Sequence, residues 1–221
     1  MRTLAVDTAG QFGSLALVED GQIVAEQMLF SPEGFGSLVF LELQQLLKRH
    51  EWELASIQAF AAASGPGSFT GVRVGLTAVK GLAEAMGKPA YGASNLKALA
   101  RKGTAPLRAT VIDARRGEVY GAVYDADLNP VVNEEVLPFP AWLASLPKGS
   151  FEILSTGFAP FQASLAGTQF ENVPVTEHRA LAGAVGQIAE TLHCAGEAGD
   201  PAMLDANYVR RSDAELMWKE P

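Results

Sequence analysis

The sequence carries the same order of predicted elements twice, and this repeat constrains the fold more than any other feature. Residues 3–29 predict three strands, the last two joined by the hairpin signal Asp20-Gly21. Residues 108–137 predict a second triplet of strands in the same order. The first strand of each triplet ends at an aspartate, Asp7 in one and Asp113 in the other. A chance recurrence of hairpins in an α/β chain is the alternative, and the matching aspartates argue against it.

Each triplet is followed by a further apolar strand, a glycine turn and a predicted helix. These segments read IQAFAAASGPGSFTG at 57–71 and FEILSTGFAPF at 151–161. An order of elements that occurs twice predicts an α/β protein with two similar halves facing one another. We expect the halves to span residues 1–104 and 105–221, with the first half carrying any partner helices.

The charge of the chain limits what it binds. Its formal net charge is −8 and its pI is about 4.9, so the surface as a whole repels nucleic acids and anionic membranes. Any RNA that the protein serves is therefore expected to be held by a partner. The chain begins at Met1 without a charged leader and has no apolar run near 18 residues. We expect a cytoplasmic protein that does not bind membranes.

The glycine-rich stretch SGPGSFTGVRVG at 64–75 lacks both common nucleotide motifs. A Walker A loop requires Lys and then Ser or Thr directly after its last glycine, but Val72-Arg73 follow Gly71. The Rossmann spacing fails as well, because a proline interrupts the turn. The favoured interpretation is a strand-to-helix turn whose glycines allow close packing. The alternative is an anion or nucleotide loop at the helix N-terminus, capped by Thr70. Its candidate residues are Asp7, Gly67, Ser68, Thr70 and Arg73.

No set of residues predicts catalysis or a metal centre. His50, His178 and His193 lack the spacing of a metal clamp, and no G-x-S-x-G elbow is present. Cys194 is the only cysteine, which excludes disulfides within the chain, and we expect it to be a buried thiol. Asp7 and Asp113 could hold magnesium at the strand ends, but capping of the following turns is the favoured role.

Two predicted helices, 37–50 and 71–86, have more apolar or bulk-free surface than one protomer needs to cover a sheet. The first places Val39, Phe40, Leu43, Leu46 and Leu47 on its core face, and the second places Val72, Leu76, Val79, Leu82, Ala83 and Met86 there. The residues left over predict a partner interface made of Leu38, Leu41, Gln45, Val74, Ala78, Gly81 and Ala85. The alternative is that these strips pack on each other or on the second half of the chain.

Four stretches together resemble the TsaB family of bacterial proteins, which are required for threonylcarbamoyladenosine synthesis in tRNA. They are LAVDTA at 4–9, ASGPGSFTGVRVGLTAVKGLA at 63–83, VIDARRGEVYGAVYD at 111–125 and ANYVRR at 206–211. The resemblance runs from Met1 to about Arg211. One departure is Gly36-Ser37, where family members often have His-Ser.

The resemblance implies duplicated ribonuclease-H-like halves of the actin-like ATPase (ASKHA) superfamily. It implies a non-catalytic scaffold and activator of the transferase TsaD, which modifies ANN-decoding tRNAs, with the ATPase TsaE completing the complex. The helices at 37–50 and 71–86 would pair with TsaD, or with a second copy as a homodimer when the chain is alone. tRNA would be contacted only indirectly, no cofactor would bind tightly, and ATP or ADP would bind at the level of the complex.

The rival interpretation makes the chain an enzyme in its own right. It would then be a nucleotide hydrolase of the actin-like group, or an M22-type peptidase, the class to which related proteins were once assigned. Turnover of ATP or peptide by the purified chain would distinguish it from the scaffold.

Overall fold

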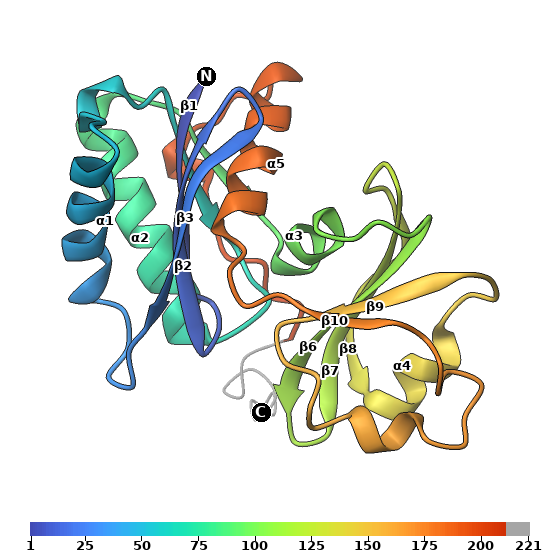
Figure 1. The fold of residues 1–221 in the computed structure, drawn as a ribbon. Coiled ribbons are helices and arrows are strands. Elements are labelled where there is room, and N and C mark those ends of the chain that lie inside the picture. The colour runs from blue at the N-terminus through green and yellow to red at the C-terminus, as the bar shows by residue number, and fades with distance from the viewer. Residues whose placement is uncertain (211–221) are drawn as a thin grey trace, which may run out of the picture.

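The computed structural model describes residues 1–210, which form two five-stranded sheets flanked by helices (Figure 1). The first sheet has the order β3-β2-β1-β4-β5 and the second the order β10-β9-β6-β7-β8. The strands of the first sheet are β1 (Arg2–Asp7), β2 (Phe12–Glu19), β3 (Gln22–Phe30), β4 (Ala59–Ala63) and β5 (Ala90–Ala93). Those of the second are β6 (Leu107–Arg115), β7 (Glu118–Asp125), β8 (Pro130–Pro138), β9 (Phe151–Ser155) and β10 (Val175–Glu177).

The two sheets confirm the predicted repeat. In each, three consecutive strands form an antiparallel meander, and the next strand pairs parallel with the first strand of that meander. The first sheet lies entirely within residues 1–104 and the second within 105–221. The helices are α1 (Leu38–Arg49), α2 (Phe69–Met86), α3 (Asn95–Arg101), α4 (Phe139–Ser145) and α5 (Ala182–Cys194), with short 3₁₀ turns η1 (Leu54–Ser56), η2 (Gln162–Leu165) and η3 (Pro201–Met203).

The second half departs from the repeat after its fourth strand. The predicted helix after β9 is wrong, because only the 3₁₀ turn η2 forms there. The segment after β9 instead packs Phe158, Phe161 and Leu165 against the second sheet, together with α4. The aromatic side chains fill the space that a longer helix would occupy.

The first sheet is the middle layer of three, with α1 and α2 on one face and α5 on the other (Figure 1). Strand alternation sorts the side chains between the faces. Leu4 and Val6 of β1 point toward α1 and α2, whereas Ala5 points toward α5. Because the α5 face is built largely from alanines, that helix approaches the sheet closely.

Helix α5 belongs in space with the first sheet although it follows the second in sequence. Its Gly186 lies so close to the sheet that a Cβ there would come within 2.7 Å of Val18 Cγ2 and 3.2 Å of Ala5 Cβ. At the end of α5 the expectation of a buried Cys194 is wrong, because the thiol is exposed. The helix has already left the sheet at that point, since its buried residues end at Glu190.

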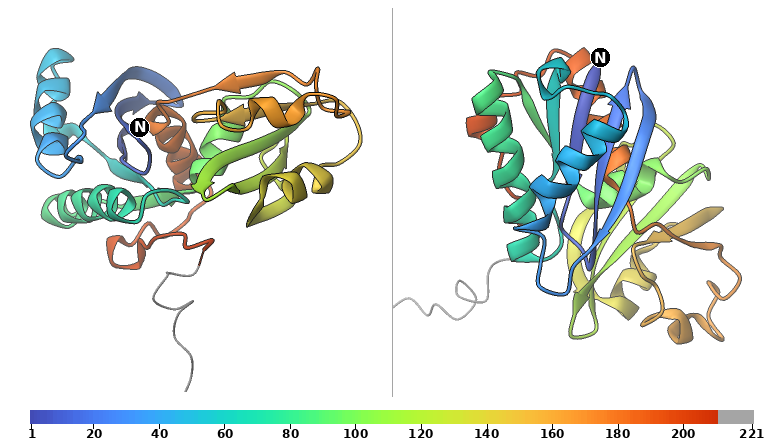
Figure 2. Two further views of the ribbon diagram at one scale, coloured as in Figure 1. Left: turned by 90° about the horizontal axis from the view of Figure 1, so that it is seen from below. Right: turned by 60° about the vertical axis from the view of Figure 1, so that its left-hand side comes forward.

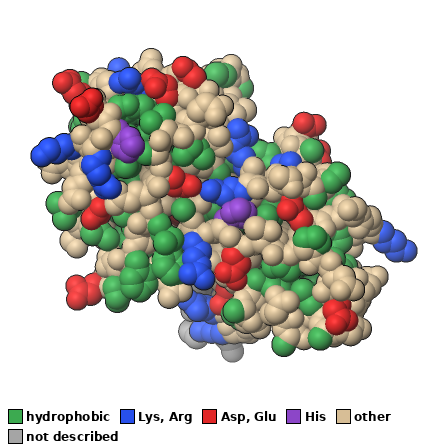
Figure 3. All heavy atoms as spheres, viewed as in Figure 1, with side chains coloured by type: hydrophobic (Ala, Val, Ile, Leu, Met, Phe, Trp, Pro, Cys, Tyr) green, Lys and Arg blue, Asp and Glu red, His purple; other side chains and the backbone are tan. Residues whose placement is uncertain are grey.

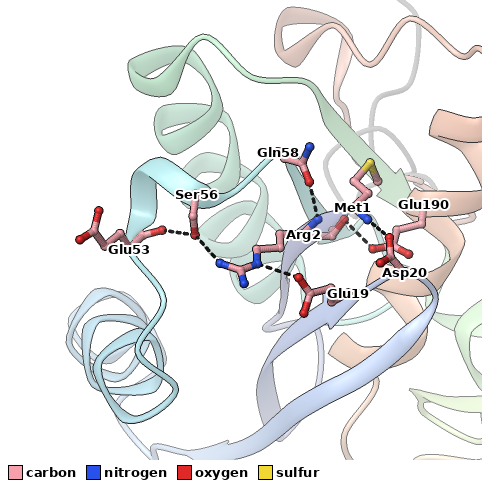
Figure 4. A network of polar contacts seen from close by, with 9 residues as sticks. Met1, Arg2, Glu19, Asp20, Glu53, Ser56, Gln58 and Glu190 are labelled. Atoms are coloured by element: carbon pink, nitrogen blue, oxygen red, sulfur yellow. Dashed lines mark hydrogen bonds and ion pairs between the residues drawn. The ribbon is translucent and has the colours of Figure 1, made fainter.

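Polar contacts anchor the start of β1 to its neighbours (Figure 4). The N-terminal amine pairs with Asp20 of the β2–β3 hairpin, and Arg2 Nε donates to Glu19 Oε1 over 2.8 Å. Thr3 Oγ1 donates to the buried carboxylate of Glu190 on α5 over 3.2 Å. These bonds hold both the hairpin and α5 to the first strand.

Glu134 of β8 joins the two halves. Its carboxylate accepts hydrogen bonds from Ser94 at the start of α3, from Tyr124 of β7 and from Asn207 near the end of the described chain. The Asn207 N–H in turn donates to the carbonyl of Ser64 over 2.7 Å. No helix within residues 1–210 is both long and apolar enough to span a bilayer.

Two matched glycine-to-alanine changes test the close packing of α5. We expect Gly186→Ala to lower the free energy of unfolding by about 1–3 kcal/mol, because the new methyl group overpacks the layer between α5 and the sheet. Gly81→Ala in α2 is the control, since a Cβ there meets nothing within 4 Å. It should raise stability by about 0.5–1 kcal/mol through helix propensity. Urea denaturation measures both, and a Gly186→Ala protein as stable as the control would contradict the packing.

Candidate functional site

The two candidate partner helices, α1 and α2, lie side by side on one face of the first sheet (Figure 2). Helix α2 begins where Ser68 adopts an extended conformation and its Oγ accepts a hydrogen bond from the Gly71 N–H over 3.2 Å. It ends at Gly87, whose φ of 58° is left-handed. The prediction that Thr70 caps the helix is therefore wrong. Thr70 already lies inside the first turn, because the cap is two residues earlier.

The predicted interface residues divide between the surface and the core. Leu41 is 51% exposed, and Gln45, Gly81 and Ala85 are exposed as well. Leu38 and Val74 are half-buried against the core of the first half. Ala78 was predicted at the interface and is only 4% exposed. It belongs to the core cluster shared by α1 and α2, so its small side chain serves packing within the protomer.

Phe40 shows the opposite departure from the sequence analysis. It was predicted on the core face of α1 but is 52% exposed. The buried arc of α1 is centred on Val39, Leu43 and Leu46, and Phe40 lies at its margin. The exposed apolar surface of α1 is therefore larger than the sequence predicted. We call Phe40, Leu41, Gly81 and Ala85 the partner strip.

The glycine loop shapes a close contact between α2 and the end of β1. A Cβ on Gly67 or Gly71 would clash with the backbone carbonyls of Ala9 and Thr8, respectively. A Cβ on Gly75 would come within 2.7 Å of the Thr8 hydroxyl, which itself donates to the Gly71 carbonyl over 2.7 Å. The structure thus confirms the turn interpretation of the loop.

The two repeat aspartates cap turns, as the sequence predicted. Asp7 Oδ1 accepts from the Ala9 N–H over 2.9 Å, and Asp113 Oδ1 accepts from the Arg115 N–H over 2.7 Å. Asp7 is buried and also accepts from Asn95 Nδ2 over 3.2 Å. Burial is the main cause that raises the pKa of Asp7 to about 6, against the lowering effect of these two hydrogen bonds.

The structure brings the candidate anion-loop residues into one region without directing them at a common point. The Ser68 N–H donates to the Ala9 carbonyl over 2.7 Å, and the Gly71 N–H donates to the Ser68 hydroxyl. Arg73 is turned toward Tyr208, whose hydroxyl accepts from Arg73 Nε over 3.1 Å. An anion or nucleotide site at Asp7, Gly67, Ser68, Thr70 and Arg73 stays a prediction.

Metal-ligating side chains do not gather in the described chain. Within residues 1–210 no group of three His, Cys, Asp or Glu side chains could hold a metal ion. His50 follows α1, His178 follows β10, and His193 on α5 contacts the Tyr91 hydroxyl over 2.8 Å through Nδ1. These residues do not fit a metal centre.

The sequence analysis missed the role of the segment after η3. The Tyr208 ring lies 5.8 Å from the Phe69 ring in the first half, and Asn207 donates to Glu134 of β8. ANYVRR was singled out only for its resemblance, and no local periodicity could place it beside α2. Arg211, the last residue of that stretch, lies outside the described residues.

Comparisons with known proteins match one family model and several named relatives. Residues 39–192 match the model of the family described as TsaD: tRNA N6-adenosine threonylcarbamoyltransferase. The chain is similar to two proteins named tRNA threonylcarbamoyladenosine biosynthesis protein TsaB. In Bacillus subtilis the identity is 29%, covering 100% of this chain and 99% of the relative. In Escherichia coli it is 40%, but the match spans only 61% of this chain and 60% of the relative.

A solved structure supports the fold over the whole chain. The crystal structure of an uncharacterized protein with similarity to peptidase YeaZ, from Pseudomonas aeruginosa, superposes with a TM-score of 0.82 and 26% identity. The match covers 95% of this chain and 99% of that chain. The predicted fold class, duplicated ribonuclease-H-like halves of the actin-like ATPase superfamily, is confirmed.

The pKa of Asp7 makes a testable prediction about stability and pH. The folded protein holds a proton on Asp7 that the unfolded chain releases near pH 4, so this residue makes stability fall as pH rises from about 4 to about 6. The loss amounts to about 3 kcal/mol above that range. Asp7→Asn keeps the acceptor oxygen for Ala9 and Asn95 and removes the charge.

We therefore expect Asp7→Asn to be more stable than the wild type at pH 7.5 and to have a flatter dependence between pH 4 and 6. Urea denaturation across this pH range measures it. Asp113→Asn makes the same change in the equivalent turn of the second half, where the side chain is 28% exposed, and serves as the control. An Asp7→Asn protein with the wild-type slope would show that the buried carboxylate is not the cause.

Proposed function

Because the chain belongs to the TsaD family and is similar to proteins named TsaB, we propose that it acts in tRNA threonylcarbamoyladenosine biosynthesis as a non-catalytic subunit. In this proposal it binds TsaD and holds that transferase in its active form. TsaD carries out the transfer of the threonylcarbamoyl group to adenosine in ANN-decoding tRNAs. TsaE joins through the assembled complex.

The observation that supports this proposal is the partner strip on α1 and α2. Phe40 and Leu41 expose 52% and 51% of their surface on adjacent positions of α1. Full burial of such a side chain contributes about 1.5–3 kcal/mol, so a partner that covers the remaining half of each gains roughly 1 kcal/mol per residue. Gly81 and Ala85 on α2 add exposed positions without bulk, which allow a partner helix to approach closely.

The same surface accounts for two modes of assembly. When TsaD is present, one of its helices covers the partner strip. When the chain is alone, a second copy covers it and forms a homodimer. The two modes compete for one surface, so adding TsaD should dissociate the homodimer.

The proposal assigns the chemistry and its cofactors to the complex. ATP or ADP binds to the assembled complex, and the isolated chain carries no tightly bound cofactor. The complex works in the cytoplasm, where its tRNA substrates are found. In the proposed function TsaD holds the tRNA, and this chain contacts it only indirectly.

Two substitutions in the partner strip should abolish co-purification with TsaD. Leu41→Asp buries an unpaired charge in an apolar contact, and Gly81→Arg adds bulk where a helix must approach. We expect each to weaken binding at least about 30-fold, corresponding to about 2 kcal/mol. We choose Gly81 rather than Ala78 for this substitution, because Ala78 is buried in the core and an arginine there would destabilise the fold. Isothermal titration or a pull-down with purified TsaD measures binding.

Two matched variants serve as controls. Val131→Asp introduces the same charge at a residue of β8 that is 49% exposed, and Gly81→Ala changes α2 without blocking its surface. Both should bind TsaD as the wild type does. Wild-type affinity of Leu41→Asp and Gly81→Arg, with all variants folded by circular dichroism, would contradict the proposal.

A further inference from the structure

We infer that this chain contacts RNA directly through a strip of arginines and exposed aromatic rings at the end of the described chain. The arginine strip consists of Arg73, Arg115, Arg116 and Arg210, with the rings of Phe69 and Tyr208 beside them. It goes beyond the proposed function, in which TsaD holds the tRNA, and it rests on that function only for the identity of the RNA.

One end of the strip lies at the first turn of α2. The guanidinium carbon of Arg73 lies 3.9 Å from the centre of the Phe69 ring. The Phe69 and Tyr208 rings are 5.8 Å apart, and Arg73 Nε donates to the Tyr208 hydroxyl. Phe69 remains 49% exposed and Tyr208 51% exposed, so both rings keep surface on which a base can stack.

The other end of the strip lies on the β6–β7 turn of the second half. Arg210 is only two residues after Tyr208, so their Cα atoms are at most about 7 Å apart. Arg210 Nη1 donates to the Ala114 carbonyl over 2.9 Å, and its Nη2 pairs with Glu118. Arg115 lies opposite Glu118 in the antiparallel pairing of β6 and β7, so the arginines of this turn lie next to Arg210.

The conformation of the turn does not require arginine. Arg115 and Arg116 have φ angles of 68° and 56°, both in the left-handed region. Asparagine or glycine adopts this conformation at lower cost, and holding a bulkier residue there costs of order 1 kcal/mol. The Arg115 side chain is 82% exposed, with one ion pair to Asp113 at 3.6 Å. The turn therefore presents charge to solvent at some expense of backbone energy.

The strip gathers guanidinium groups on an acidic protein. Arg115 pairs with Asp113 and Arg210 pairs with Glu118, and the whole chain has a formal charge of −8. Charges beyond about 10 Å are screened at physiological salt, so the strip acts on a nearby phosphate more strongly than the net charge does. Lys and Arg side chains lie scattered along the border of the two halves on the face shown in Figure 3.

Guanidinium groups beside stackable rings fit a nucleotide unit, with phosphate on the arginines and the base on a ring. That chemistry is shared by a free nucleotide and by RNA. RNA is favoured because the arginines come from both halves, Arg73 from α2 and the others from the second half, and an RNA backbone places successive phosphates along such a strip. The strip also starts on α2, the helix that carries part of the partner strip, so RNA held by TsaD would pass close to it.

The double variant Arg115→Asn/Arg116→Asn tests this inference while keeping a residue that tolerates left-handed dihedrals. Binding of a fluorescein-labelled, unmodified tRNA transcript is measured by anisotropy, with the chain alone at low salt and with the complex with TsaD at 150 mM salt. Each lost phosphate contact should weaken binding about four- to six-fold, so the double variant should lose about 15- to 35-fold, with a shallower salt dependence. Tyr208→Ala should lose roughly ten-fold through stacking. Lys148→Asn, an exposed cation outside the strip, is the control and should bind as the wild type does.

The outcomes separate this inference from the proposed function. Loss of tRNA binding by the double variant and by Tyr208→Ala, in proteins that still bind TsaD, supports the strip. Wild-type tRNA affinity of the double variant overturns it, as does an equal loss in Lys148→Asn. Loss of ATP binding without loss of tRNA binding also overturns it and identifies a free-nucleotide site. If TsaD does not bind the chain at all, the proposed function fails, and the chain-alone measurement still decides the RNA contact.

Discussion

The contact between the start of α2 and the end of β1 is the constraint on which the other features depend. Gly67, Gly71 and Gly75 remove the side chains that would otherwise hold α2 away from Thr8 and Ala9. The helix is fixed by this contact at its N-terminus and by its apolar face along its length. It consequently places Gly81 and Ala85 on the surface beside α1, and Phe69 and Arg73 beside the second half. A side chain at Gly71 would displace both surfaces at once.

Small residues serve two different purposes in this fold. On α5, Gly186 brings the helix close to an alanine-rich sheet within the protomer, so the space that its side chain would occupy is already filled by the sheet. On α2, Ala78 is likewise used inside, but Gly81 faces open space. Composition alone does not distinguish these cases. The distance to the nearest atom does, and it shows that Gly81 does not serve packing within the protomer.

The parts of the fold that the sequence predicted well are those set by local physics. The strand triplets, the turn-capping aspartates and the glycine turn all follow from residues adjacent in the chain. The errors in burial and in the helix after β9 concern features that tertiary packing determines. Phe40 was predicted to be buried and is exposed, whereas Ala78 was predicted at the interface and is buried, because the width of a buried arc depends on how two helices pack together. No helix forms after β9 because aromatic side chains from α4 and the segment after β9 fill that space. The segment around Tyr208 could not be placed because its neighbours are distant in sequence.

Hydrogen exchange of the chain with and without TsaD tests the central claim, that α1 and α2 present surface which a second subunit must cover. The account predicts slower amide exchange in residues 38–49 and 69–86 when TsaD is added, with α5 and β8 unchanged. Slowing confined to α5 or to the second sheet, with α1 and α2 exchanging as before, would contradict it.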